Sequence, residues 1–161
     1  MMLIFKDLKP YKDLKIAEGI SGVYLWGFVI NEKFRPYYVG KSTNIAWRLT
    51  EHMANIIGGN YSIYDKESLL SFDKSKIAVY APYQLSDKLL FLNARNNGLK
   101  KHVNFLVDNF HFTYAEVADY RTNGRIAEIN TIESIGKYIL INKRGGTRSD
   151  KIDVGNLRDI I

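Results

Sequence analysis

Two tyrosines with glycines close by, and a lysine that follows them, are the first residues in the sequence that suggest chemistry. In the stretch GVYLWGFVINEKFRPYYVGKS, Tyr24 comes two residues after one glycine, Tyr38 comes two residues before another, and Lys41 follows directly. A phenol can donate or accept a proton, and a lysine ammonium can hold an anion. Such residues suit proton transfer beside a negatively charged substrate.

Arg48 and His52 extend this set. They are four residues apart, so they share one edge of a helix predicted over 44–57. The planar guanidinium of arginine matches two phosphate oxygens, and histidine can transfer protons near neutral pH. Lys41 and Arg48 also lie beside an expected turn and helix end, where a phosphate could be reached.

Several other chemistries lack the residues they need. The chain has no cysteine, which excludes thiol nucleophiles, disulfides and thiolate metal sites. Its GKST segment is not a P-loop, because an arginine stands at position 35, where that motif requires glycine. The three histidines show no HExxH or other paired spacing, and no G-x-S-x-G motif is present, so neither a zinc site nor a serine hydrolase is predicted.

The charge of the chain indicates an anionic partner. The 161 residues carry a formal net charge of +6, which favours nucleic acid first. Basic side chains recur beside expected turns and helix ends, at Lys41, Arg48, Lys100, Lys101, Arg121, Arg125, Lys143, Arg144 and Arg148. No apolar run has the length of a membrane span, and the opening residues lack the features of a signal peptide, so we expect no membrane partner and a cytoplasmic location.

Hydrophobic periodicity predicts the elements that must position these residues. The expected strands cover 22–30, 36–40, 75–81 and 110–118, with a short one at 3–5, and the expected helices cover 44–57, 86–97, 99–109 and 125–141. This order indicates a small α/β (α+β) fold, with a mostly antiparallel sheet flanked by helices. The strand over 22–30 has apolar residues on both faces, so we expect cover on both sides. Thr43 or Asn44 is the expected cap of the first helix.

In this order and at this spacing, the residues resemble the GIY-YIG endonuclease family. The first motif stands as Gly22-Val23-Tyr24 and the second as Tyr38-Val39-Gly40. The family's arginine, ten residues after the second tyrosine, matches Arg48, and its histidine one helical turn later matches His52. The likeness covers about residues 20–142 of a single domain over 1–161, which leaves an arm over 1–19, a helical insertion over 85–109 and a tail over 143–161.

The resemblance implies a metal-dependent endonuclease that hydrolyses DNA, with one Mg²⁺ or Mn²⁺ in each active site. A single glutamate would hold the metal. We prefer Glu128 to Glu133, because Glu128 lies nearer to an isoleucine stripe on its helix. Arg48 would hold the scissile phosphate, and Lys41 would be a further substrate contact.

The tyrosines and the histidine would handle protons and water in this hypothesis. Tyr24 is the candidate general base, and cationic neighbours would have to lower its pKa from the ordinary value of about 10. Tyr38 would orient water or phosphate by hydrogen bonding. His52 would share proton transfer with Tyr24 or hold the phosphate.

Two other functions and several details stay open at this point. The chain could be a nucleic-acid-binding module of the same fold that does not cut, or an unrelated α/β interaction domain. RNA is an alternative substrate, and restriction, repair and mobile-element roles are equally compatible with the motifs. An enzyme that cuts both strands would act as a homodimer, since one active site cuts one strand.

Overall fold

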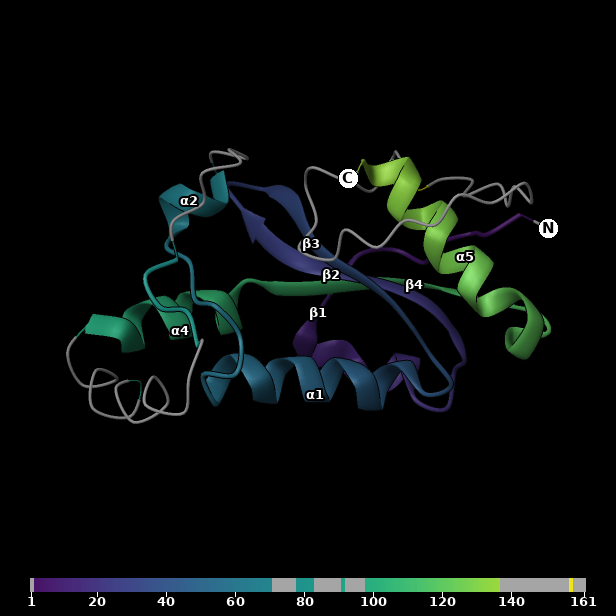
Figure 1. Ribbon diagram of the computed structural model, residues 1–161, viewed down its shortest axis with the longest axis horizontal. Helices are drawn as coiled ribbons and strands as arrows, with labels where there is room; N and C mark the ends of the chain where they lie inside the picture. The colour runs from purple at the N-terminus through teal and green to yellow at the C-terminus, as the bar shows by residue number, and fades with distance from the viewer. Residues whose placement is uncertain (1, 71–77, 83–90, 92–97, 137–156, 158–161) are drawn as a thin grey trace. The chain divides into compact units, whose positions relative to one another are not determined.

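The computed structural model describes residues 2–70, 78–82, 91, 98–136 and 157 (Figure 1). The chain divides into two compact units. The first comprises Met1–Leu49 and Phe110–Ile161, and the second comprises Thr50–Asn109. The expected insertion over 85–109 falls within the second unit.

The first unit is built on a four-stranded antiparallel sheet with the order β1-β4-β2-β3. The strands are β1 (Lys9–Pro10), β2 (Gly22–Ile30), β3 (Lys33–Ser42) and β4 (Phe110–Glu116). Strand β2 has the predicted bounds and lies between its two long neighbours, while β3 forms an edge. The predicted α+β class and the antiparallel sheet are therefore confirmed.

The hairpin between β2 and β3 is tighter than the sequence predicted. Asn31 and Glu32 have φ angles of 52° and 63°, as in a two-residue turn, so β3 begins at Lys33 and not at Pro36. Proline has no N–H to donate and is tolerated in an edge strand or at a bulge. Pro36 meets both conditions, because it pairs with Gly27 beside the register shift of this edge strand.

The two faces of the sheet carry different side chains. One, which we call the aromatic face, carries Tyr24, Trp26, Phe28, Tyr38, Phe110, Phe112 and Tyr114. The opposite, aliphatic face contributes Val23, Leu25, Val39 and Ala115 to a core that also contains Ala127, Ile132 and Ile135. Both faces of β2 are buried, as the sequence predicted.

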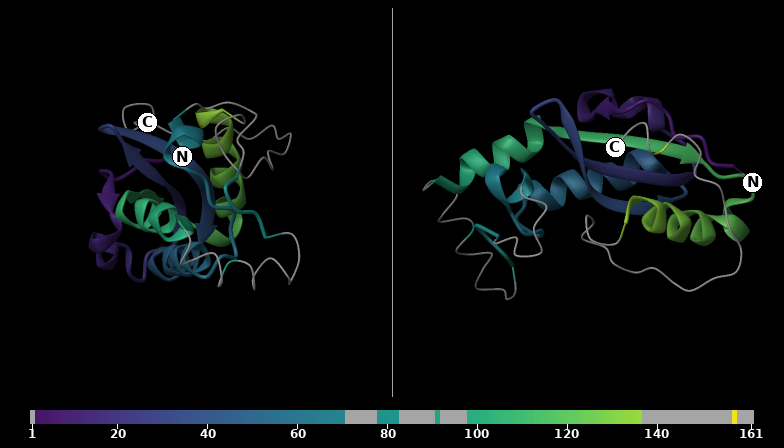
Figure 2. Two further views of the ribbon diagram at one scale, coloured as in Figure 1. Left: turned by 90° about the vertical axis from the view of Figure 1, so that its left-hand side faces the viewer. Right: turned by 90° about the horizontal axis from the view of Figure 1, so that it is seen from above.

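Each face of the sheet is covered by a different helix (Figures 1 and 2). The 3₁₀ helix η1 (Tyr11–Ala17) lies on the aromatic face, where the Tyr114 hydroxyl donates a hydrogen bond of 3.1 Å to the carbonyl of Ile16. Helix α5 (Tyr120–Ile135) packs on the aliphatic face. In the described residues, no helix has the length and apolar character needed to cross a membrane.

Helix α1 (Ile45–Ile57) begins in the first unit and continues into the second. The Asn44 side chain accepts a hydrogen bond of 3.1 Å from the Trp47 N–H, so Asn44 is the cap, one of the two residues expected. On the side facing the protein, Ile45 and Leu49 are fully buried. The cap therefore fixes where the turn that carries Arg48 begins.

Helix α5 begins five residues before the predicted start at 125. Residues 120–124 were not included in the predicted helix, but Gly124 is a buried residue inside it. The helix ends at Ile135, where Gly136 has a φ angle of 93°. Residues 137–141 of the predicted helix lie outside the described residues.

Other predictions had mixed outcomes. Helix α4 (Lys100–Asp108) and strand β4 lie within one or two residues of their predicted bounds. The predicted strand at 3–5 was wrong, because these residues belong to no strand, although Leu3 and Phe5 are buried in the core. In the predicted strand over 75–81, the described residues form an isolated bridge between Tyr80 and Ile63. The predicted helix over 86–97 lies outside the described residues except at position 91.

Candidate active site

Tyr24 and Tyr38 stack on the aromatic face of the hairpin. Their ring centroids are 6.3 Å apart and their planes differ by 21°. Tyr24 pairs across the strands with Gly40, where an added Cβ would lie 2.6 Å from Tyr24 Cζ and 2.8 Å from Tyr38 Cε1. Real Cβ atoms do not come so close, so glycine at this position is what allows the two rings to lie over β3.

Arg48 lies on the first turn of α1, close to the ends of the motif strands. Its backbone N–H donates a hydrogen bond of 3.2 Å to the carbonyl of Asn44, and its side chain is half-buried. In Figure 1 this turn lies on the side of the sheet opposite α5. An approach of the Arg48 guanidinium to the two tyrosines stays a prediction.

His52 lies one turn further along α1, in the second unit. Its side chain is 1% exposed, and Nδ1 is 2.7 Å from the Tyr61 hydroxyl. This bond holds the imidazole inside the second unit. A share of His52 in proton transfer stays a prediction.

Lys41 and Glu128 come together on the aliphatic side of β3. Burial raises the pKa of the half-buried Glu128 carboxyl, and the positive charges of Lys41 and Arg125 oppose that increase. The Lys41 Nζ atom lies 5.6 Å from the centroid of the Tyr120 ring, within the range of a cation–π interaction. Burial and the charge of Glu128 both raise the pKa of Tyr120. We call Lys41, Tyr120 and Glu128 the lysine–glutamate cluster.

The sequence analysis missed Tyr120, although the sequence contains a signal for it. Tyr120, Gly124 and Glu128 follow one another at intervals of four residues, so they share one edge of α5. A Cβ added at Gly124 would lie 2.9 Å from Tyr120 Cε2, so this glycine leaves the space that the ring occupies. A prediction that began α5 at position 125 could not include this pattern.

Glu128 and Glu133, the two candidate metal ligands, have different surroundings. Glu133 is exposed on α5, whereas Glu128 is half-buried within the electrostatic range of Lys41 and Tyr120. A half-buried carboxylate gains more from a neighbouring cation than an exposed one does, because water screens its charge less. The surroundings therefore favour Glu128.

The described residues form two groups, one on each face of the hairpin. Because side chains alternate along a strand, Tyr38 points to the aromatic face and Lys41 to the opposite one. Tyr24 and Tyr38 thus lie on one side, and Lys41 and Glu128 on the other. The two groups share β3, the last strand of the described sheet.

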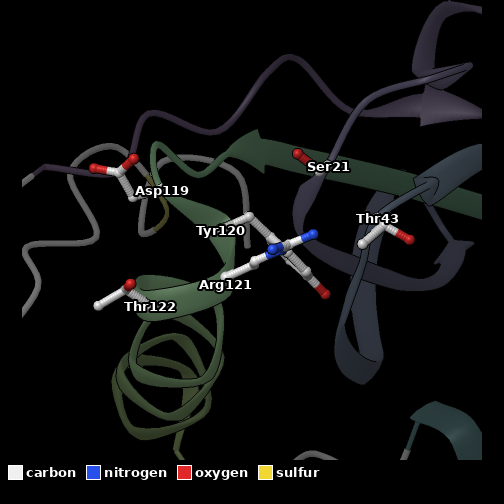
Figure 3. A pocket seen from close by; sticks show the side chains of 6 residues that line it. All are labelled: Ser21, Thr43, Asp119, Tyr120, Arg121 and Thr122. Carbon is white, nitrogen blue, oxygen red and sulfur yellow. The ribbon is translucent and has the colours of Figure 1, made fainter.

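A pocket of about 530 Å³ adjoins the lysine–glutamate cluster (Figure 3). It is lined by Ser21, Thr43, Asp119, Tyr120, Arg121 and Thr122. In Figure 3 the side chains of Tyr120 and Arg121 extend from the start of α5 toward the segment that carries Thr43. Tyr120 therefore belongs both to the cluster and to the wall of the pocket.

The donor atoms fit a magnesium ion that keeps most of its water. In the described part of the chain, no group of three or more histidine, aspartate or glutamate side chains lies close enough together to hold a metal. Magnesium in phosphate chemistry is often bound by one or two carboxylates, with water and substrate phosphate completing its shell. Burial raises the pKa of Glu128 more than the charges of Lys41 and Arg125 lower it, so a further cation beside the carboxylate would stabilise its ionised form.

Comparisons with known proteins identify no relative: no family model, no curated protein and no solved structure matches the chain. The resemblance to GIY-YIG endonucleases thus depends on the motif residues alone. Membership of that family stays a prediction.

Proposed function

We propose that this protein is a metal-dependent endonuclease that hydrolyses phosphodiester bonds in DNA. The observation that carries the proposal is the proximity of Glu128 to Lys41, the residue directly after the second motif. These residues are far apart in the sequence, and the resemblance requires an acid and the second motif to meet in one site. The stacked tyrosines on the other side of β3 support the same function.

The chain's own residues would bind the phosphate and move the proton. Arg48 and Lys41 would hold the scissile phosphate and neutralise its charge, which increases in the transition state. Tyr24 would accept the proton of the attacking water, and Tyr38 would orient that water by hydrogen bonding. Glu128 would hold Mg²⁺ or Mn²⁺, which supplies Lewis-acid stabilisation of the phosphate when it is bound.

The outer edge of β3 is where a DNA backbone would reach both groups of residues. Strand β3 is the last strand of the described sheet, and its side chains alternate between the face that carries Tyr38 and the face that carries Lys41. The absence of cysteine agrees with a reducing cytoplasm as the place of action. Cleavage of both strands would require a homodimer.

Supercoiled plasmid DNA provides the first test. We expect nicking in Mg²⁺, none in EDTA, and a loss of at least about a hundredfold in Arg48→Ala and Glu128→Gln, since each removes charge stabilisation in the transition state. Glu133→Gln is the matched control on the same helix and should keep its activity. Full activity in Glu128→Gln, or an equal loss in Glu133→Gln, would contradict the assignment.

Thermal unfolding tests the metal site without relying on activity. Mg²⁺ should raise the Tm of the wild type, because a ligand that binds only the folded state stabilises it. Glu128→Gln should lose this increase, and Glu133→Gln should keep it. An increase that is equal in all three proteins would place the metal elsewhere.

A DNA-binding module that does not cut is the second candidate. It is favoured by one observation, the division of the predicted residues between the two faces of the hairpin. This alternative predicts salt-sensitive DNA binding by the wild type without nicking in Mg²⁺ or Mn²⁺. Nicking that depends on Glu128 would exclude it.

A further inference from the structure

The two tryptophans of the chain have opposite surroundings. Trp26 is fully buried and packs against Phe110 with ring centroids 4.9 Å apart. Trp47 is 66% exposed, the highest value among the large apolar side chains of the described residues. A single exposed apolar residue needs no explanation by itself. The position of Trp47 beside the candidate site is the reason to consider a function for it.

Trp47 lies at the end of α1 that borders the candidate site. Asn44 caps the helix through the Trp47 N–H, so the backbone of this residue is held in place. Helical side chains lean toward the helix N-terminus, which here carries Thr43, one of the residues lining the pocket with Arg121. The next residue in the chain is Arg48. An exposed indole thus lies on the first turn of α1, directly before Arg48 in the chain and four residues after Thr43, which lines the pocket.

We propose that Trp47 stacks on a nucleobase of the bound DNA strand and thereby positions the nucleotide beside the scissile phosphate. Aromatic side chains beside a positively charged surface bind nucleic acid strands in this way, because each base presents a π-face and each phosphate a charge. The net charge of +6 favours DNA over an apolar partner for this surface. The inference rests on the proposed function, and Trp47 is a positioning residue in it.

Intrinsic fluorescence tests this proposal, because the buried Trp26 contributes little to quenching by a ligand or by iodide. Mixed-sequence DNA, single-stranded and duplex, is added to the full chain in EDTA, so that binding is measured without cleavage. We expect the DNA to quench Trp47 and to protect it from iodide. Heparin, which has negative charges but no bases, should not quench it.

Affinity measurements with three variants complete the test. Trp47→Ala removes the ring on which one base would stack, so it should weaken DNA binding by about ten- to a hundredfold. Trp47→Phe should recover most of the affinity, because it keeps an aromatic face. Ile4→Ala is the control, since Ile4 is another exposed apolar residue, with 58% exposure.

The outcomes separate this inference from the proposed function. Three results would overturn the role of Trp47. The first is an unchanged DNA affinity in Trp47→Ala, and the second is quenching of Trp47 fluorescence by heparin equal to that by DNA. The third is quenching that arises from self-association of the protein without DNA. Absence of DNA binding by the wild type would overturn it as well. If DNA quenches Trp47 and no nicking occurs, the stacking role stands and the nuclease fails. If nicking depends on Glu128 and Trp47→Ala binds normally, the nuclease stands alone.

Discussion

At the scale of single residues, the surroundings of Glu128 are the most informative for the proposed function. Its carboxyl is half-buried, its pKa is raised by burial, and Lys41 and Arg125 compensate only part of that cost. Because this compensation is incomplete, the ionised carboxyl lowers the stability of the folded state. An acid that served only to stabilise the fold would normally have a lowered pKa.

Replacing this carboxyl should therefore stabilise the protein at neutral pH. Between the ordinary pKa of a glutamate and the raised pKa of Glu128, the folded state binds more protons than the unfolded state, so the free energy of unfolding falls as the pH rises through this window. Glu128→Gln removes that loss. Urea unfolding at a series of pH values without metal measures this effect. The free energy of unfolding of the variant should exceed that of the wild type at pH 7 and equal it in acid. A variant that is less stable at pH 7 would contradict the physical account of Glu128.

At the scale of elements, the first turn of α1 connects the second motif to Arg48. The Asn44 N–H donates a hydrogen bond of 3.0 Å to the Ser42 hydroxyl, and the Asn44 side chain caps the helix. These local bonds set the direction in which the helix leaves β3. They determine where both Arg48 and Trp47 lie.

Loss of the cap should affect stability and catalysis together. Asn44→Ala removes the acceptor of the Trp47 N–H and should lower the free energy of unfolding by about 1 kcal/mol. It should also lower the nicking rate, because Arg48 would no longer be held in place. Asn44→Ser keeps a capping oxygen and should restore both values. Chemical unfolding and plasmid nicking measure the two effects, and a fully active, fully stable Asn44→Ala would show that this turn is held by other contacts.

At the scale of the whole molecule, the positive charge sets how binding responds to salt. Each phosphate that a side chain neutralises releases counterions, so the logarithm of affinity falls with the logarithm of salt concentration in proportion to the number of such contacts. The formal charge of +6 does not show which cations take part. The position of each lysine in the fold makes that question testable.

Lys41 and Lys33 offer a matched comparison from the two halves of one edge strand. Both side chains are exposed, but Lys33 lies beside the turn and Lys41 beside Glu128 and Tyr120. Lys41→Ala should weaken DNA binding and reduce the steepness of the salt dependence by about one contact, whereas Lys33→Ala should change neither. Fluorescence anisotropy across a salt series measures both quantities. An unchanged slope in Lys41→Ala would remove this lysine from the phosphate contacts.

The sequence by itself determined the elements whose pattern is local. The alternation in β2, the apolar stripe of α1 and the capping residue Asn44 can all be read within a few residues, and the structure has them as predicted. The tight turn at Asn31-Glu32 and the start of α5 were placed wrongly, because the place of Pro36 in an edge strand and the burial of Gly124 within a helix depend on tertiary partners. The candidate tyrosines, arginine and acid came from the resemblance of their order and spacing to GIY-YIG endonucleases, and their roles stay predictions.

Only the tertiary structure decided which of these candidates meet. Strand pairing places Tyr24 over Gly40, and the packing of α5 on the aliphatic face brings Glu128 to Lys41. The same packing adds Tyr120, which no motif contains. Contacts of this kind form when faces that are far apart in the chain are buried against each other. A local pattern of residues does not determine which faces these are.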